Sequence, residues 1–152
     1  NCIPAILGVS MQEAFKNKEI SKIAIAIWKE GLGVVKKAGV KLASLPDFPL
    51  ERLEKLTVLP LEEAAQIFSG IMTNLSKEPL YGSVLQSIKR GKKSEIDFLN
   101  GEFVALANEH GERAPLNEQL VAMVHAVEKE KKFFAPDELI AAVVPGLIGT
   151  LA

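Results

Sequence analysis

Residues 83–101 read Ser83-Val84-Leu85-Gln86-Ser87-Ile88-Lys89-Arg90-Gly91-Lys92-Lys93-Ser94-Glu95-Ile96-Asp97-Phe98-Leu99-Asn100-Gly101 and predict a short helix, a basic turn and the start of a longer helix. The short helix should begin at Ser83 and end at Gly91, since glycine commonly follows the last helical residue. Ser94 should cap the next helix, with Asp97 placed to bond the backbone N–H of the cap. Two helix starts would then lie close together, and their free N–H groups suit an anion.

Ser83 and Glu95, near these two helix starts, admit two interpretations. Serine and acidic residues at such positions are usually capping residues with a structural role. Alternatively, they face a small anionic ligand, with Glu95 as the one acidic group that enters the turn. The residues by themselves leave both interpretations open.

The composition is that of an ordinary globular domain. The chain has 152 residues, of which 48% are hydrophobic and 24% charged, so we expect one domain with a full hydrophobic core. The net charge of −1 gives no electrostatic footprint for nucleic acid or an anionic membrane, and the 6% of aromatic residues give no evident base-stacking surface. Cys2 is the single cysteine, which excludes an internal disulfide and fits the reducing cytoplasm.

Metal sites and targeting segments are not expected. His110 and His125 stand apart from each other and from any Cys or acidic pair at metal-ligand spacing. The start of the chain lacks a basic region followed by an apolar core, so we expect no signal peptide there. The chain opens with Asn1 instead of Met, and we expect a trimmed or dissected piece. A membrane span would need about 20 uninterrupted apolar residues, which the apolar end of the chain does not provide.

The hydrophobic pattern predicts helices and no confident strand, hence an all-α bundle. The expected helices cover residues 1–7, 11–15, 19–38, 50–56, 61–74, 83–90, 94–109, 115–132 and 137–152. The helix over 94–109 is apolar on several sides and should lie inside the bundle. Gly31 and Gly33 should permit close approach of a neighbouring helix, and Trp28 should be a packing residue. The last helix should be interrupted at Pro145 and serve packing or subunit contact.

The pattern Ser-x-Leu-Gln-x-Ile-x-x-Gly-x-x-x-Glu-Ile-Asp-x-Leu-Asn-Gly over residues 83–101 resembles the C-terminal domain signature of ketopantoate reductases (2-dehydropantoate 2-reductases). The likeness continues in register through Ala107, His110-Gly111, Ala114-Pro115 and Asn117, and it ends near Glu128. It covers residues 1–132 and leaves 133–152 as an apolar tail.

This resemblance implies a fold and an activity. The fold would be a multi-helix bundle like the 6-phosphogluconate dehydrogenase C-terminal-like domain, used for substrate binding and dimerisation. An N-terminal Rossmann domain, which this chain lacks, would bind most of the NADPH. The parent enzyme would be a cytoplasmic homodimer and would reduce a 2-oxo acid, ketopantoate, to pantoate in pantothenate biosynthesis. The isolated domain would be inactive.

The resemblance also implies site residues. Asn1 and Ser83 would bind substrate, and Glu95 would be a catalytic residue that binds a substrate hydroxyl and tunes the catalytic lysine. That lysine would lie four residues before Asn1. Ala5 and Leu80 replace asparagines that the family commonly carries, which leaves the exact 2-oxo acid open.

A second hypothesis is a non-catalytic, all-helical dimerisation or scaffolding module. In that case Ser83 and Glu95 are capping residues, and the apolar segment 137–152 forms the interface. The upstream sequence, or loss of catalysis on changing Ser83 and Glu95, would distinguish the two hypotheses.

Overall fold

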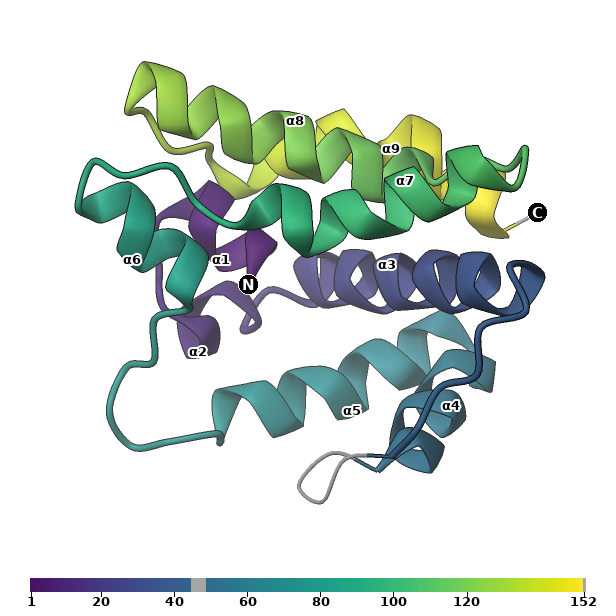
Figure 1. Ribbon diagram of the computed structural model, residues 1–152. Coiled ribbons are helices and arrows are strands. Elements are labelled where there is room, and N and C mark those ends of the chain that lie inside the picture. The colour runs from purple at the N-terminus through teal and green to yellow at the C-terminus, as the bar shows by residue number, and fades with distance from the viewer. Residues whose placement is uncertain (45–48, 152) are drawn as a thin grey trace.

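The computed structural model describes residues 1–44 and 49–151 of the chain, and every regular element within them is helical (Figure 1). The elements are α1 (Cys2–Leu7), α2 (Met11–Ala14), α3 (Lys18–Lys37), α4 (Leu50–Val58), α5 (Leu61–Thr73), α6 (Ser83–Lys89), the 3-10 helix η1 (Ile96–Phe98), α7 (Asn100–Glu109), α8 (Pro115–Glu130) and α9 (Pro136–Leu151). The all-α prediction is therefore confirmed for these residues. Ala152, the end of the last predicted helix, lies outside them.

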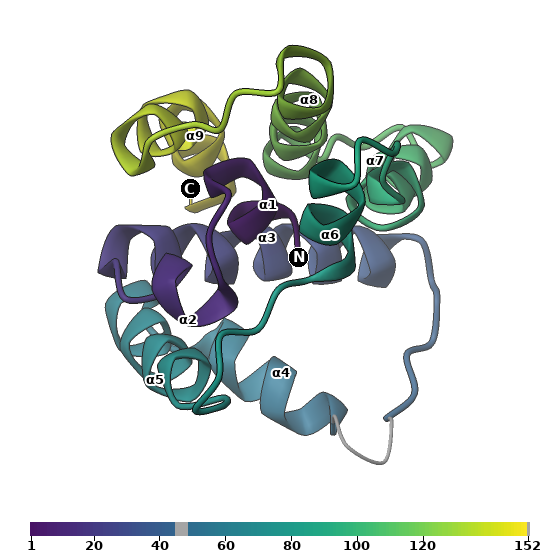
Figure 2. The ribbon, with the colours of Figure 1, turned by 90° about the vertical axis from the view of Figure 1, so that its left-hand side faces the viewer.

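Helix α3 runs through the middle of the molecule. Figures 1 and 2 show α7, α8 and α9 on one side of it and α4 and α5 on the other. Its position follows from its sequence, because apolar residues of α3 face both groups of helices and are buried (Ile20, Ile23, Ala24, Ile25, Ala26, Ile27). Asn17 caps it by accepting the N–H groups of Glu19 and Ile20 at 2.9 and 3.3 Å. The predicted helix over 19–38 is confirmed.

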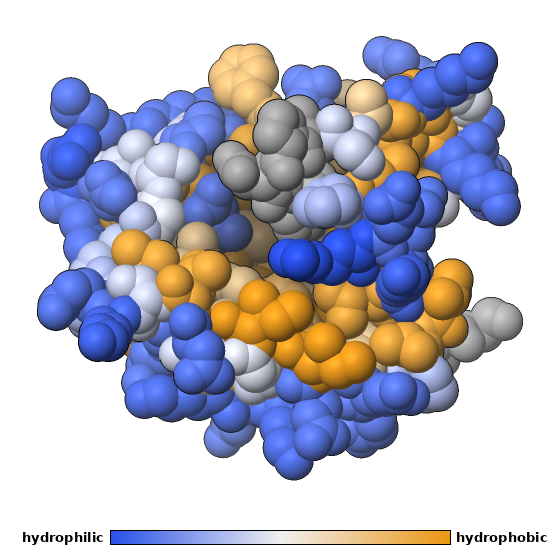
Figure 3. All heavy atoms as spheres, turned by 90° about the horizontal axis from the view of Figure 1, so that it is seen from below, coloured by the Kyte–Doolittle hydropathy of each residue, from blue (hydrophilic) through white to orange (hydrophobic). Residues whose placement is uncertain are grey.

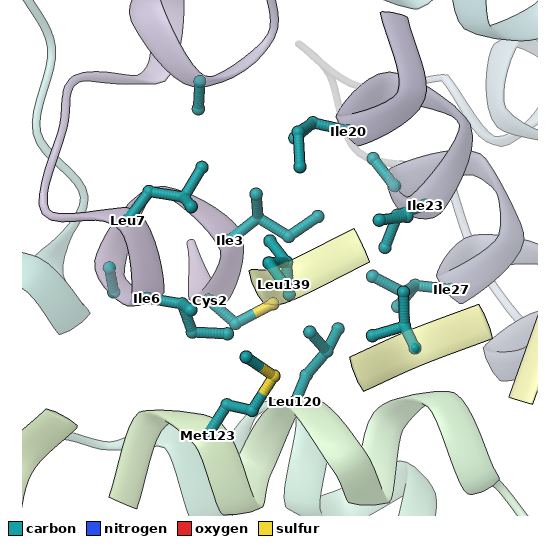
Figure 4. Close-up of a cluster of buried hydrophobic side chains, with 14 of the residues drawn as sticks. Cys2, Ile3, Ile6, Leu7, Ile20, Ile23, Ile27, Leu120, Met123 and Leu139 are labelled. Carbon is teal, nitrogen blue, oxygen red and sulfur yellow. The ribbon is translucent and has the colours of Figure 1, made fainter. Parts of the chain in front are cut away.

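The hydrophobic core joins the two ends of the chain to α3. Figure 4 shows side chains from α1, α3, α8 and α9 pointing toward one another: Cys2, Ile3, Ile6, Leu7, Ile20, Ile23, Ile27, Leu120, Met123 and Leu139. Each fully buried Ile or Leu stabilises the fold by about 1.5–3 kcal/mol relative to an exposed one. Because all six residues of α1 are buried, the start of the chain is held firmly in the core.

The predicted helix over 94–109 is wrong in its first part. Residues 96–98 form the 3-10 turn η1, the backbone breaks at Leu99, and α7 begins only at Asn100. Ser94 does not cap a helix; it is 7% exposed, and its backbone N–H donates to Glu128 of α8 at 2.7 Å. A long-range hydrogen bond to Glu128 has replaced the expected cap at Ser94. The second helix, α7, therefore begins at Asn100, farther along the chain from α6 than predicted.

Helix α7 also lies at the surface, contrary to the prediction that it would sit inside the bundle. Within α7 only Ala107 is buried, and Phe98, just before it, is 76% exposed. The buried member of this region is Ile96 in η1. Phe98, Leu99 and Phe103 border a groove, described below. Ala107 belongs to a small second hydrophobic cluster with Val34 and Ala114.

The glycine and Trp28 predictions for α3 are confirmed in part. A Cβ on Gly31 would lie 3.1 Å from the Phe103 ring, so this glycine admits the close approach of α7. The prediction for Gly33 is wrong, because Gly33 is exposed and no atom lies within 4 Å of its Cβ position. Trp28 packs edge-on against Phe68, with ring centroids 5.2 Å apart, as predicted for a packing residue.

Helix α9 is continuous through Pro145, so the predicted interruption is wrong. A proline removes the hydrogen bond to the carbonyl four residues earlier. That carbonyl belongs to Ala141, and both Ala141 and Pro145 are exposed, so water can take the place of the lost N–H. On the other face Leu139 and Val143 are buried in the core, 0% and 1% exposed. Packing against the rest of the molecule therefore outweighs the single lost bond.

Candidate functional site

Asn1 and Ser83 come together at the start of α1 and the start of α6. The side-chain amide oxygen of Asn1 packs against Gly82, in the space that a Cβ on that residue would occupy. Gly82 directly precedes Ser83, the first residue of α6. Asn1 and Ser83 are both exposed, and neither side chain caps its own helix. Glycine at position 82 is therefore what lets the Asn1 carboxamide reach the start of α6.

Gln12 of α2 fixes the segment that leads into α6. Its Nε2 donates to the carbonyls of Ser76 and Glu78 at 3.2 and 2.8 Å, and its Oε1 accepts the N–H of Leu80 at 3.0 Å. The carbonyl of Leu80 in turn accepts the N–H of Met11 at 2.8 Å. Sequence reasoning missed Gln12, because its partners lie more than sixty residues away in the chain and no local pattern marks it.

Glu95 lies in the turn between α6 and η1 and is half-buried. Its carboxylate forms no hydrogen bond or ion pair within residues 1–44 and 49–151, and the Ser83 hydroxyl forms none there either. No hydrogen bond joins Glu95 to Asn1 or Ser83 in the same residues. The Glu95 carboxylate and the Ser83 hydroxyl are therefore available to bond a ligand. Neither side chain forms a hydrogen bond that caps a helix.

The two positions that depart from the family pattern are apolar in different surroundings. Ala5 lies one turn after Asn1 and is fully buried in the core. Leu80 is exposed, two residues before Gly82, and only its backbone is bound, to Gln12 and Met11. An asparagine at position 5 would have to be accommodated inside the core, whereas position 80 could present a polar side chain to solvent.

A large groove of about 890 Å³ lies beside this region, between α3, α4, α5 and the η1–α7 segment. Figure 3 shows apolar surface gathered around a hollow on the lower face of the molecule. Its apolar lining includes Met11, Phe15, Ile27, Trp28, Leu32, Val35, Leu53, Leu56, Phe68, Ile71, Met72, Leu75, Phe98, Leu99 and Phe103. Asn1, Asn100 and Asn117 are its amide-bearing members, while Ser83 and Glu95 are not among the lining residues.

A buried polar network runs from the core toward the start of α1. The Glu30 carboxylate accepts the N–H groups of Leu116 and Asn117 at 2.9 and 2.8 Å, and the Asn117 side-chain amide at 2.7 Å. Asn117 Oδ1 then accepts Asn100 Nδ2 at 2.8 Å. Glu30 thus caps α8 from another helix.

Burial raises the pKa of the neighbouring Cys2 thiol, which argues against a reactive cysteine there.

His125 of α8 is not isolated from acidic residues, contrary to the sequence-based interpretation. Its Nε2 lies 2.7 Å from Asp97 Oδ1, and its Nδ1 lies 2.9 Å from Glu128 Oε2. The spacing of His125 and Glu128, three residues apart on a helix, could have indicated one of these contacts. In the part of the chain that the structure describes, no group of three or more His, Cys, Asp or Glu side chains is arranged to hold a metal ion.

The family model described as "Ketopantoate reductase PanE/ApbA C terminal" matches residues 1–128. The chain belongs to this family. Among its relatives are proteins named 2-dehydropantoate 2-reductase from Pyrococcus horikoshii, Archaeoglobus fulgidus and Pyrococcus abyssi, which are 33%, 26% and 28% identical over 128 residues. The matched part is 84% of this chain but only 36% of each relative's length. No solved structure matches the chain.

Membership in the ketopantoate reductase family raises the question of where a dinucleotide cofactor would bind. The described residues contain no strand, and Gly31 and Gly33 lie inside α3 instead of in a strand-to-helix turn. These residues therefore do not fit a dinucleotide site of the Rossmann type.

None of the helices in the described residues combines the length and the apolar character that a membrane span requires.

Proposed function

We propose that this chain is the C-terminal, substrate-binding domain of an NADPH-dependent 2-oxo acid reductase, of the kind that reduces 2-dehydropantoate (ketopantoate) to pantoate in pantothenate biosynthesis. A Rossmann domain earlier in the parent polypeptide would bind most of the NADPH, and the enzyme would work in the cytoplasm. The observation that carries the proposal is the family match over residues 1–128, which includes Asn1, Ser83 and Glu95 together.

Asn1 and Ser83 would bind the polar groups of the substrate. The packing of the Asn1 carboxamide against Gly82 supports this role, because it places an amide beside the start of α6. An amide and a hydroxyl are suitable donors for a carboxylate or a carbonyl oxygen. In their proposed roles they orient the substrate, which is the main contribution a protein makes to a cofactor-driven reduction.

Glu95 would accept a hydrogen bond from a substrate hydroxyl. It would also tune the pKa of the catalytic lysine, because a nearby carboxylate favours the charged form of a lysine. A carboxylate close to an anionic 2-oxo acid is unfavourable unless a cation stands between them. A lysine four residues before Asn1 would supply that cation, since residues four apart share one face of a helix. The absence of any partner for the Glu95 carboxylate among the described residues supports this role.

The test uses the full-length parent protein and measures NADPH consumption with ketopantoate and a panel of branched 2-oxo acids. Glu95→Gln and Ser83→Ala should each lower kcat/KM by a factor on the order of 10²–10³. Neither change should lower the unfolding midpoint, because neither side chain is bonded within the described fold. Glu63→Gln, at an exposed position in the first turn of α5, is the matched control. Unchanged catalysis with reduced stability would show that Ser83 and Glu95 are structural residues.

The second candidate is a non-catalytic dimerisation or scaffolding module. The 890 Å³ apolar groove and the exposed Phe98 beside it favour a surface that contacts another polypeptide. This candidate predicts that the parent protein reduces none of the 2-oxo acids. Measuring the mass of the parent in solution would also test the proposed homodimer.

A further inference from the structure

The turn that carries Glu95 is held by α8 on both sides. On one side, the Ser94 N–H donates to Glu128 Oε1 at 2.7 Å. On the other side, Asp97 Oδ1 lies 2.7 Å from His125 Nε2, and His125 Nδ1 lies 2.9 Å from Glu128 Oε2. Ser94, Glu128, His125 and Asp97 therefore form one continuous chain of hydrogen bonds around Glu95, which itself has no partner in the described residues.

We propose that His125 is a positioning residue, which holds the 94–97 turn against α8 and so keeps the Glu95 carboxylate oriented for the substrate. This inference rests on the proposed function, because it assigns His125 a role through Glu95. Because the Glu95 side chain bonds to no other described group, the backbone of the turn alone sets the direction of its Cα–Cβ bond and so the region that the carboxylate can reach. That backbone is tied by the hydrogen bonds of Ser94 and Asp97 and by the burial of Ile96.

The hydrogen bonds require a protonated imidazole. Both ring nitrogens face carboxylate oxygens, which only accept when ionised, so both nitrogens must donate. The hydrogen bond to Glu128 raises the pKa of His125; burial opposes this, and the bond to Asp97 adds to it. The hydrogen bond from His125 lowers the pKa of Asp97. Burial raises the pKa of Glu128, but hydrogen bonds from Ser94 and His125 outweigh it and the pKa is lowered.

The charged groups around His125 come from both elements that pack there. Asp97 lies in η1 and Glu128 in α8, and the Lys93 ammonium pairs with the second Asp97 oxygen at 3.2 Å. A hollow of about 280 Å³ beside the ring is also lined by basic side chains, which disfavour the imidazolium: Lys92, Lys93, Lys129 and Lys131. The two carboxylates in direct contact outweigh these lysines, since the pKa of His125 is raised.

Loss of the ring proton should loosen the turn. A neutral imidazole can donate to Asp97 or to Glu128 but not to both, and the remaining contact then brings two acceptors together. The ordinary pKa of histidine is about 6.5, so a raised pKa keeps this chain intact beyond about pH 6.5. Above the raised pKa of His125, the turn no longer holds Glu95 in one position against α8, and substrate binding weakens.

The test is the pH profile of KM and kcat in the full-length parent reductase. His125→Gln should raise KM for the 2-oxo acid roughly 3- to 10-fold near pH 6, the weight of about one hydrogen bond, with a smaller change in kcat. It should also remove the rise of KM with pH that the parent shows above the His125 pKa. Glu128→Gln can accept the Ser94 N–H with its oxygen and donate from its nitrogen to Nδ1 of a neutral His125, so it should also flatten that rise. His110→Gln is the matched control. The His110 ring lies outside the 94–97 turn and contacts the Leu106 carbonyl at 3.0 Å, so this change should alter neither KM nor its dependence on pH.

The outcomes separate this inference from the proposed function. If Glu95→Gln abolishes catalysis while His125→Gln keeps the parent's KM and pH profile, the proposed function stands and the role of His125 is refuted. A His125→Gln protein with a lower unfolding midpoint but normal KM in its folded state also refutes it. If Glu95→Gln leaves catalysis unchanged, the role of Glu95 fails and the inference fails with it. Loss of the pH-dependent rise in both His125→Gln and Glu128→Gln would support the inference.

Discussion

Glu30 is a charged side chain in the interior, 8% exposed, and its role depends on where α8 begins. Helix starts leave N–H groups without partners, and a buried start must find acceptors elsewhere in the fold. Glu30 of α3 supplies them for Leu116 and Asn117. Three donors, counting the Asn117 side chain, depend on this one carboxylate.

Glu30→Ala should therefore destabilise the chain by about 2–4 kcal/mol, since it leaves buried donors unsatisfied. Urea-induced unfolding measures the loss. Glu112→Ala is the matched control, because Glu112 pairs with Lys37 at the surface at 2.7 Å and should contribute less than about 1 kcal/mol. Equal losses for the two variants would show that Glu30 is not a cap of α8.

Individual residues in the candidate site differ in how far sequence could place them. Asn1, Ser83 and Glu95 were named from the family pattern, and their proposed roles remain untested. Glu30 and Gln12 were missed as residues that hold the site, because their partners are distant in the chain. For His125, only the contact with Glu128 had a local signal, and the contact with Asp97 had none. A sequence pattern records local spacing and does not show which of these distant groups meet.

At the scale of helices, most boundaries follow from periodicity and end signals. Helices α3, α5 and α8 were predicted within two residues, because their apolar residues recur at helical spacing and glycine or proline marks their ends. The failure over residues 94–99 has a physical cause. Glu128 and His125 of α8 bind Ser94 and Asp97, so the residues expected to form a local cap are used in long-range contacts.

The end of α1 depends on Gly8, which has φ +71° and lies beneath the Phe133 ring. A Cβ at this position would be 2.5 Å from Phe133 Cγ, close to the stem of that side chain. Next to it, the Phe134 N–H donates to the Ile6 carbonyl at 3.0 Å. The turn after α1 thus anchors the connection between α8 and α9.

Gly8→Ala should destabilise the chain by about 2–4 kcal/mol, from left-handed backbone strain plus overlap with Phe133. Gly39→Ala isolates the first contribution, because Gly39 has φ +70° and no atom within 4 Å of its Cβ position. That control should cost about 1–2 kcal/mol. Thermal and urea unfolding of both, and of Gly8→Ala combined with Phe133→Ala, measure the difference. If Gly8→Ala and Gly39→Ala are equally costly, Phe133 does not restrict position 8.

For the molecule as a whole, the described residues provide a helical surface and no dinucleotide fold. We therefore predict that this chain alone, folded as judged by circular dichroism, does not oxidise NADPH with ketopantoate or other 2-oxo acids. The full-length parent should do so under the same conditions. Turnover by this chain alone would refute the proposed division of work between two domains.

The all-α class was predictable from sequence, but the groove beside Asn1 was not, since it depends on how α3, α4, α5 and α7 pack together.

The position of α9 has a practical consequence for anyone who divides this polypeptide by likeness to its family. The family match stops at residue 128, yet Leu139 and Val143 beyond it fill space between α3 and α8. A boundary drawn where the likeness ends would cut through the hydrophobic interior and expose it to water. The stretch that matches the family is therefore shorter than the stretch that contributes to the hydrophobic core.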